Sequence, residues 1–454
     1  MKNLLLFTAL IFFLALCGSC NKDVLDEKPD KSQLVPTTLD DFQELLNNND
    51  LMNLSGGLSS LSTDDLYNES GLPSSTALER NAYPWLADIY QGSTLSPDWN
   101  TPYQQVLYAN IVLDGLAGVN RPEDAERFDQ VKGEALFFRC WAFFNLAQLF
   151  CVPYSPANEG RPGIPMPLSS NVNVRPPRGT LKAVYDRVLA DLAEAKGLLP
   201  ERSTVLTHPS KAGIAAFLSR IYLVMGDYAA ARAAASEALG FNSQLTDFNT
   251  LNFTATYTFP VPLPNQREEI AFYNNSVGYS FFNASTTFVD SLLYRSYGAN
   301  DLRRQAFFVT KALGKVQFKG NYSGGRALFT GLATDEIYLN RAEASARLGD
   351  GQAAMTDLNT LLKTRYKTGT FTGLQAADAG QALRLVMSER RKELINRGIR
   401  WTDLRRYNLE KDFAVTLRRM TAGAEYTLPP DDPRYVFPIP PAELQQNNLE
   451  QNPR

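Results

Sequence analysis

KAGIAAFLSRIYLVMGDYAAARAAASEAL, residues 211–239, and EIYLNRAEASARLGDGQAAMTDLNTL, residues 336–361, carry the pattern that decides the fold. Six positions with spacings of 3, 4, 1, 4 and 7 recur in both stretches: Ser219, Tyr222, Gly226, Asp227, Ala231 and Ala238 in the first, and Ala342, Ser345, Gly349, Asp350, Ala354 and Leu361 in the second. Small residues at fixed positions let two antiparallel helices approach closely, and Gly-Asp provides the turn between them. The sequence therefore predicts two helical hairpins, 123 residues apart.

This pattern resembles the tetratricopeptide hairpin, and further helical segments extend the array on both sides. Apolar periodicity predicts helices over residues 131–150, 181–199 and 382–397. Outside the amino-terminal apolar segment, residues 135–150 form the longest apolar run. Sixteen residues span about 24 Å as a helix, which is shorter than the hydrocarbon core of a bilayer, about 30 Å, so a buried helix is expected. The predicted fold class is mainly α, a tetratricopeptide-like helical-repeat scaffold with large loop excursions and a few short strands.

Two regions outside the helices are predicted to be loops that hold the binding residues. Glycine and proline punctuate residues 55–99, and residues 245–325 contain only short strand signals, at 270–274 and 315–322. Loops on a rigid scaffold are where binding residues concentrate. The candidate ligand-binding residues are Asp64, Asp65, Tyr67, Tyr83, Trp85 and Tyr90 in the first region, and Tyr273, Asn274 and Tyr279, next to Phe281 and Phe282, in the second.

The amino terminus predicts export and lipid anchoring. Lys2 precedes an apolar run that ends at Gly18-Ser19-Cys20, so residues 1–19 are predicted to be a lipoprotein signal peptide and Cys20 the acylated residue. An ordinary secretory signal with a chance cysteine is the alternative, and Cys17 departs from the lipoprotein pattern. Residues 20–36 are expected to form a flexible tether, followed by an N-terminal region over 37–240 and a C-terminal region over 241–454. Thr38 is predicted to cap a first helix over residues 38–46.

Composition and charge limit which ligands the protein is expected to bind and which catalytic or metal sites it could contain. The formal charge is −3 and the sequence shows no basic stripe interleaved with aromatics, so nucleic acid is not expected as a ligand. Cys140 and Cys151 are expected to pack in the core without forming a disulfide. His208 is the single histidine, which excludes multi-histidine metal sites and leaves no standard nucleophile–histidine triad. No metal site and no cofactor are predicted.

Two carboxylate pairs remain as candidates for hydrolytic chemistry. A glycosidase needs two acids at a fixed separation, and Asp64 with Asp65, or Glu389 with Glu393, supplies two. Neighbouring loop aspartates are more often a solvated cluster, and Glu389 and Glu393 lie one helical turn apart among Arg390, Arg391 and Arg397, where ion pairing accounts for them. We therefore expect that the protein is not an enzyme. The remaining aromatic and amide side chains suit a sugar or a peptide.

Several motifs resemble the SusD/RagB family of surface lipoproteins. Residues 133–144 resemble the first long buried helix of that family, and residues 334–350 its second repeat region. Residues 389–406, beginning ERRKEL, resemble its C-terminal signature, and FPIP at 437–440 with Glu443, Asn447 and QNP at 451–453 resembles its ending. Arg397 stands where glutamate is common, a departure expected to alter one surface ion pair.

The resemblance implies a function but no individual ligand contact. It implies an outer-membrane lipoprotein, anchored by lipid and facing the cell exterior, that binds an oligosaccharide and delivers it to a TonB-dependent, SusC-like β-barrel transporter. The signature residues are implied to be structural. Three alternatives stay open: a peptide-binding member of the same family, a surface glycosidase and an interaction scaffold without a small ligand.

Overall fold

The computed structural model describes residues 36–92, 96–119, 125–262 and 269–454. Long helices build the scaffold: α6 (Pro97–Ala117), α7 (Ala125–Phe150), α8 (Leu181–Leu198), α9 (Lys211–Met225), α10 (Tyr228–Phe241), α13 (Thr334–Arg347), α14 (Gly351–Lys363) and α15 (Ala379–Glu393). Shorter helices are α2 (Leu39–Leu46), α3 (Asn49–Met52), α4 (Leu58–Leu61), α5 (Ala77–Ala82), α11 (Ser291–Ser296), α12 (Arg303–Ala306), α16 (Arg400–Tyr407) and α17 (Pro441–Asn447). The signal, the lipidation residue Cys20 and nearly all of the predicted tether lie outside the described residues.

Both predicted hairpins form, and their turns match residue for residue. Gly226 and Gly349 take left-handed conformations with φ of 78° and 88°, which end α9 and α13. Asp227 and Asp350 then cap α10 and α14, each accepting a hydrogen bond of 3.0 Å from the backbone three residues on. Glycine reaches such φ values without the steric cost of a Cβ, and aspartate satisfies the free N–H groups of the next helix. The shared sequence pattern therefore encodes a shared turn.

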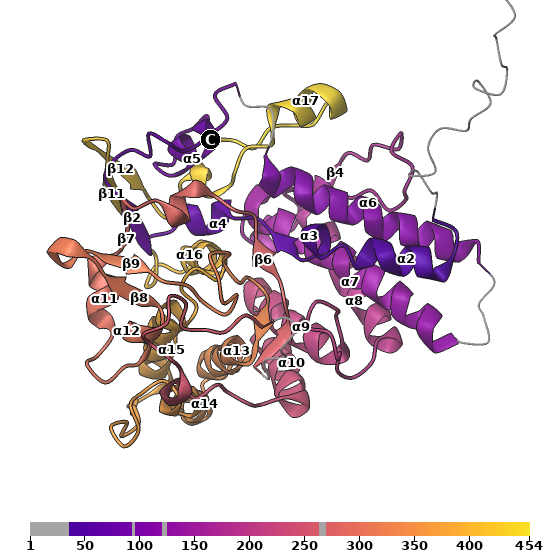
Figure 1. Cartoon of the computed structure of the whole chain (residues 1–454). Coiled ribbons are helices and arrows are strands. Elements are labelled where there is room, and N and C mark those ends of the chain that lie inside the picture. The colour runs from indigo at the N-terminus through magenta and orange to yellow at the C-terminus, as the bar shows by residue number, and fades with distance from the viewer. Residues whose placement is uncertain (1–35, 93–95, 120–124, 263–268) are drawn as a thin grey trace, which may run out of the picture.

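The helices stack into one array, which confirms the mainly-α, repeat-type fold. α6, α7 and α8 pack in sequence, α9 and α10 follow, and α10 lies against α13, so the two hairpins are neighbours despite their separation in sequence (Figure 1). α14 and α15 extend the array beyond α13. The main core takes side chains from both sides of residue 240, and the proposed boundary there stays a prediction.

The helix over residues 131–150 is confirmed as buried. In α7, apolar side chains are buried all around the helix from Ala135 to Phe150. Phe137 and Trp141 contact Phe217 of α9 and Phe272, with ring centroids 4.8 to 5.8 Å apart. Cys140 and Cys151 are buried free thiols, as expected. Within the described residues, no helix combines the length and the apolar character needed to cross a bilayer.

Some elements agree with the sequence prediction and others escaped it. Thr38 caps α2 through a capping box, and α8 and α15 fall within three or four residues of their predicted bounds. α6 was missed because Pro97 indicated the end of the loop region over residues 55–99, although Pro97 occupies the first turn of the helix, where proline is tolerated. The hairpin near residue 420 was also missed, since its alternation covers only five residues a strand.

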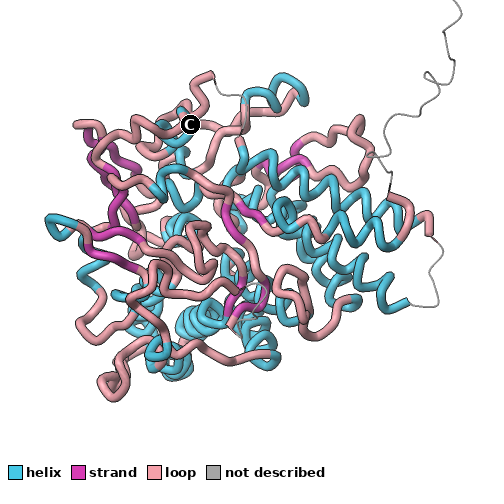
Figure 2. The backbone as a smooth tube through the Cα atoms, in the orientation of Figure 1, coloured by secondary structure: helices cyan, strands magenta, loops and turns pink. Residues whose placement is uncertain are grey.

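The strands pair only in twos and hold the loops against the helical array. The pairs are β1 (Leu54–Ser55) with β6 (Asn275–Ser276), β2 (Leu66–Asn68) with β7 (Thr287–Val289), β3 (Pro162–Pro165) with β4 (Arg178–Thr180), β5 (Ile270–Phe272) with β10 (Leu332–Ala333), β8 (Phe308–Thr310) with β9 (Val316–Phe318), and β11 (Leu417–Thr421) with β12 (Ala424–Leu428). The first of these is parallel and the others are antiparallel. Three of these pairs, β2 with β7, β8 with β9 and β11 with β12, lie on the left of the view in Figure 2, and the longest helices lie to the right.

Candidate functional site

The two predicted loop regions lie side by side. β2 from the first region pairs with β7 from the second, with Tyr67 opposite Phe288. β1 pairs with β6, and Asn68 donates hydrogen bonds of 3.0 Å to the hydroxyls of Thr286 and Thr287. Residues more than 200 positions apart in the sequence therefore lie side by side.

Most of the predicted aromatic residues lie beneath that surface. Trp85 is 1% exposed and donates a hydrogen bond of 2.9 Å from its indole N–H to the Ser62 carbonyl. The Tyr83 hydroxyl accepts from the Asn68 N–H at 2.7 Å, and the Tyr90 hydroxyl donates to the Pro438 carbonyl at 2.8 Å. Tyr279 is buried and bonded to Asp98. These rings support the loops from within, and their role in ligand binding stays a prediction.

Tyr273 and Asn274 are also interior residues. Asn274 is fully buried, and its side-chain amide oxygen accepts hydrogen bonds from the hydroxyl of Ser55 at 2.6 Å and from that of Thr330 at 2.8 Å. The Tyr273 ring packs against Phe329 at 5.7 Å. Tyr67 is different, because it is half-buried at the surface and the Lys315 ammonium lies 3.1 Å from its hydroxyl and 5.1 Å from its ring centroid. Of the nine candidates, Tyr67 and Asp64 keep partly exposed side chains.

Asp64 and Asp65 bind arginines of the C-terminal signature, so they are not a solvated cluster. Arg400 makes two hydrogen bonds of 2.9 Å to the Asp64 carboxylate, and Arg391 contacts Asp65 at 3.0 Å. Burial opposes ionisation of Asp64, but the charges of Arg400 and Arg391 outweigh it and hold the pKa of that carboxyl well below its usual 3.8. Burial raises the pKa of Asp65, against the opposing charge of Arg391.

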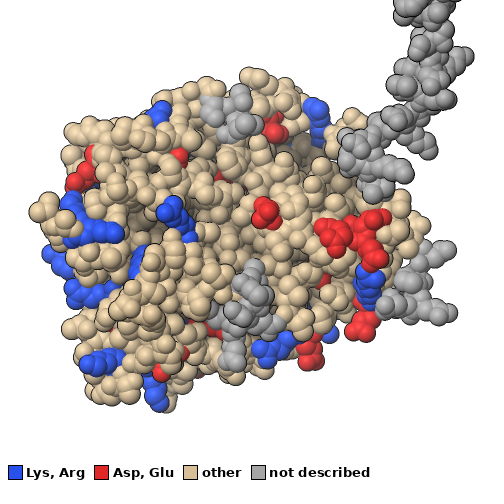
Figure 3. Space-filling view, in the orientation of Figure 1, with Lys and Arg blue, Asp and Glu red and all other residues tan. Residues whose placement is uncertain are grey.

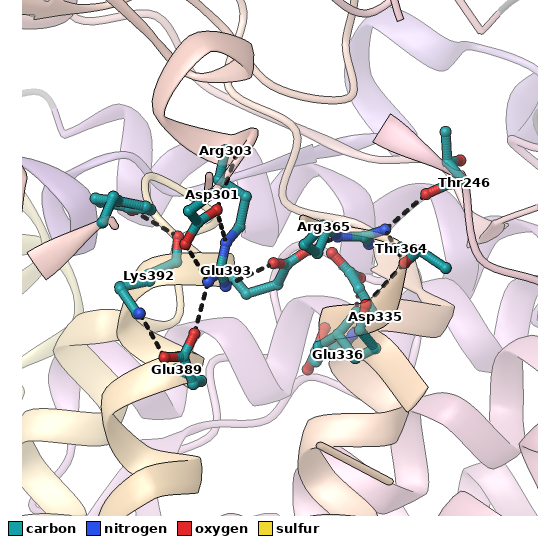
Figure 4. A network of polar contacts seen from close by, with 12 residues as sticks. Thr246, Asp301, Arg303, Asp335, Glu336, Thr364, Arg365, Glu389, Lys392 and Glu393 are labelled. Carbon is teal, nitrogen blue, oxygen red and sulfur yellow. Dashed lines mark hydrogen bonds and ion pairs between the residues drawn. The ribbon is translucent and has the colours of Figure 1, made fainter. Parts of the chain in front are cut away.

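Glu389 and Glu393 are ion-paired as expected, but with other partners than their sequence neighbours Arg390, Arg391 and Arg397. Arg303 contacts Glu389 at 2.6 Å, Glu393 at 3.1 Å and Asp301 at 2.7 Å (Figure 4). Glu393 also binds Arg365 at 2.7 Å, and both arginine side chains are completely buried. The guanidinium groups come from segments 86 and 28 residues away in the sequence. The sequence could not show them because only the tertiary fold brings these segments together.

Arg397 corrects the expectation of an altered surface ion pair. Its side chain is 2% exposed, contacts Asp335 at 3.0 Å and lies 4.5 Å from the Phe329 ring centroid and 5.0 Å from that of Tyr322. The residue is therefore part of the interior. Arg220–Glu336 at 2.7 Å joins α9 to α13 within the repeat array, and Arg390–Asp403 at 2.8 Å joins α15 to α16.

A groove opens beside the two loop regions and was not predicted as such. It encloses about 310 Å³ between β9, the segment that leads into β7 and the loop near Tyr257. Phe282, Phe318 and Tyr257 supply aromatic surface, and all three are half-buried. Gln317 lines the groove and donates to the Ser285 carbonyl at 2.9 Å and to the Thr287 carbonyl at 3.3 Å. The sequence analysis placed Phe282 beside the candidate binding residues, whereas for the residues of β9 it predicted only a short strand.

A second cleft lies elsewhere, between α6, residues 165–176 and α17. It is larger, at about 460 Å³. Three of its polar side chains are engaged within the protein: Tyr103 donates to the Pro165 carbonyl at 2.8 Å, Asn110 to the Pro167 carbonyl at 2.9 Å and Arg175 to the Gln446 carbonyl at 2.7 Å. None of the nine candidate residues lines this cleft or the groove at β9, but Phe282, their neighbour in the sequence, lines the groove. The groove at β9 is therefore the better candidate despite its smaller volume.

The described residues contain no group of three or more His, Cys, Asp and Glu side chains placed to hold a metal ion. The two cysteines are poor ligands as they stand, since burial raises the pKa of Cys140 and raises that of Cys151 to about 11. The prediction that no metal or cofactor is bound stays a prediction.

Similar proteins agree on one family. Residues 23–223 match a SusD-like family model described as starch-binding and associating with the outer membrane, and residues 334–454 match the SusD family model. SusD-like protein P2 of Formosa agariphila is 26% identical over 418 residues, which cover 78% of this chain and 79% of that protein.

Solved structures share the fold. A SusD superfamily protein from Bacteroides thetaiotaomicron has a TM-score of 0.74 at 22% identity and covers 92% of this chain and 100% of its own. A putative sugar binding protein from Bacteroides vulgatus has a TM-score of 0.75 at 21% identity, covering 93% and 99%. A laminarin binding SusD-like protein has a TM-score of 0.67 at 19% identity, covering 92% and 99%. By its sequence matches over more than two thirds of its length and by this architecture, the chain belongs to the SusD/RagB family.

Proposed function

We propose that this chain is a cell-surface lipoprotein that captures an oligosaccharide in the groove at β9 and delivers it to a TonB-dependent β-barrel transporter. Membership of the SusD/RagB family, one of whose models is described as starch-binding, supports the ligand class. The names of the sugar-binding and laminarin-binding relatives point the same way. The protein would bind its ligand without breaking bonds.

The single observation that carries this proposal is the composition of the groove. Sugars present apolar C–H faces edged by hydroxyl groups, so a protein binds them with flat rings flanked by hydrogen-bonding side chains. The groove supplies the rings of Phe282, Phe318 and Tyr257 and the polar groups of Asn283 and Gln317. Its volume of about 310 Å³ is at the lower end of the range of small-molecule sites, which suits one or two sugar units of a longer chain.

The test is calorimetric binding of a soluble form that lacks residues 1–20 to panels of glycans and peptides. We expect a glycan to bind and Phe282→Ala to weaken it by about 5- to 10-fold, since about 1 kcal/mol of ring contact is lost. Phe371→Ala is the matched control, because that half-buried ring packs on Tyr366 and does not line the groove. If peptides bind and no glycan does, the proposed ligand class is wrong.

The soluble form and its variants also test whether the protein hydrolyses a bound glycan. Hydrolysis of a bound glycan that is abolished by Asp64→Asn or Glu393→Gln would support the glycosidase alternative. The ion pairs of both acids with arginine argue for structural roles instead. An absence of any small-ligand affinity would favour the interaction scaffold.

The anchor and the transporter need separate tests. Metabolic labelling with a radioactive fatty acid in the native host should label the full-length chain and fail on Cys20→Ala. Co-purification from outer membranes should recover a β-barrel partner. We propose that the helical array provides the rigid docking face and that the loop side closes over the ligand.

A further inference from the structure

The groove at β9 is lined by cations that have no acidic partner. Lys311, Lys319 and Arg326 are the charged residues among the described residues that line it, and none of these described lining residues is acidic. Among the described residues, none of the three side chains forms an ion pair. Lys315, just outside the groove, is excluded from this set because Glu69 lies 3.4 Å from its ammonium.

Two of these cations continue the strands of the β8–β9 hairpin at opposite ends of its ladder, where the Lys311 N–H donates to the Lys315 carbonyl and the Lys319 N–H to the Phe307 carbonyl. In the β8–β9 hairpin Val309 pairs with Gln317, and side chains two residues apart on a strand point to the same face. Val309 and Lys311 therefore share a face with Gln317 and Lys319, and all four line the groove. Arg326 joins them from the loop that precedes β10.

Lys319 is fixed in place without being neutralised. Its ammonium donates a hydrogen bond of 2.8 Å to the Phe253 carbonyl. Burial lowers its pKa from the usual 10.5, as expected for a cation that loses water and gains no negative charge. Lys319 is therefore held by a neutral carbonyl and has no carboxylate partner among the described residues.

The charge is local and does not reflect a basic protein. The whole chain carries a formal charge of −3. In Figure 3, Lys and Arg gather on the left of the visible face, where β8, β9 and α11 lie, whereas Asp and Glu gather on the right near α2 and α3. On this face, Lys and Arg side chains thus gather near the β8–β9 hairpin, whose residues line the groove.

We propose that the groove selects anionic oligosaccharides, whose sugar units carry carboxylates or sulfate esters. This inference rests on the proposed function, because it specifies the ligand class for the same groove. The rings of Phe282, Phe318 and Tyr257 would contact the sugar faces. Lysine ammonium groups would bind the anions as point charges, and Arg326 would bind one through its planar fork.

The experiment compares ligands that differ only in charge. Binding of oligogalacturonates is measured against their neutral methyl esters, and binding of sulfated galactan oligosaccharides against their desulfated forms. We expect the charged member of at least one pair to bind 10-fold or more tightly, and its affinity to fall as sodium chloride rises from 50 to 500 mM. The pair that shows the preference distinguishes a carboxylate ligand from a sulfate ligand.

Variants then locate the preference. Lys311→Gln and Arg326→Gln remove exposed cations and should each weaken the charged ligand by about 2- to 5-fold while sparing the neutral one. Lys363→Gln on α14 removes a similar exposed charge outside the groove and should change neither.

The outcomes separate this inference from the proposed function. Neutral glycans that bind as tightly as charged ones, with Phe282→Ala weakening both, would overturn the charge preference and leave the proposed function standing. Failure to bind any saccharide would overturn both. Binding of acidic peptides in place of saccharides would overturn both and identify a peptide ligand.

Discussion

The interior beneath α15 and the groove at β9 place cationic side chains in opposite surroundings. Arg303 and Arg365 are fully buried, and between them they contact Asp301, Glu389, Glu393 and Glu269 at 2.6 to 3.1 Å. Lys311, Lys319 and Arg326 line an open groove and have no carboxylate partner among the described residues. The presence of acidic partners in the first region therefore distinguishes it from the second, where the described residues supply none.

The difference follows from the cost of removing a charge from water. A buried cation is tolerated only when carboxylates and hydrogen bonds replace its hydration, so the interior had to supply acids at close range. A cation in an open groove keeps part of its hydration and does not require a protein partner. The interior arginines therefore hold the fold together, and the groove cations remain free for a ligand.

Arg303→Met should have the largest effect. It leaves three acids facing one another without their shared cation, and loss of one member of a buried ion pair typically costs about 3–5 kcal/mol. We expect the free energy of unfolding in urea to fall by that amount, or the variant to fail to fold. A loss below about 1 kcal/mol would contradict the contrast between the regions.

Asp64→Asn should have an intermediate effect that depends on pH. Arg400 and Arg391 hold the folded pKa of Asp64 below its usual 3.8, so the unfolded chain binds a proton more readily. The stabilisation is therefore complete above pH 3.8 and is lost as the pH falls below that value. We expect a loss of about 2 kcal/mol at pH 7 that shrinks below pH 3.8, measured by urea unfolding across pH.

The same variant tests the predicted binding role of Asp64. If the residue is structural, Asp64→Asn should leave glycan affinity unchanged in folded protein at pH 7. A drop in affinity without loss of fold would make Asp64 a ligand residue. A stability loss that persists undiminished at low pH would contradict the ion-pair explanation.

Gln317→Ala should have a smaller effect, confined to the groove. It removes two hydrogen bonds to the carbonyls of Ser285 and Thr287, which are worth about 1 kcal/mol together when half-exposed. Amide hydrogen exchange should rise in β7 and β9, and glycan affinity should fall. Gln352→Ala on α14 is the control and should change neither; equal effects in both variants would contradict the assignment.

Arg326→Gln and Leu313→Gly should have the smallest effects on stability. Arg326 is exposed and has no ion pair, and Leu313 is 99% exposed at the β8–β9 turn with φ of 58°, a conformation that glycine adopts freely. Both variants should unfold within about 0.5 kcal/mol of the parent protein. A loss above 1 kcal/mol in Arg326→Gln would mean that this arginine is structural after all.

The sequence by itself determined the helical array. The spacing around Gly226 and Gly349 specified both hairpin turns, because a left-handed glycine followed by a capping aspartate is a local requirement. Apolar periodicity likewise located α7, α8 and α15. α6 was not predicted because Pro97, which is tolerated in the first turn of a helix, also resembles a loop residue.

Only the tertiary structure decided which polar and aromatic residues face a ligand. Trp85 and Tyr279 were predicted as ligand-binding aromatic residues in loops, but in the structure both are buried and donate hydrogen bonds to Ser62 and Asp98. Glu393 forms ion pairs with Arg303 and Arg365, whereas Lys319 has no carboxylate partner among the described residues. Helix turns depend on neighbours a few residues away, whereas burial and charge pairing depend on contacts between distant segments, which a single sequence does not display.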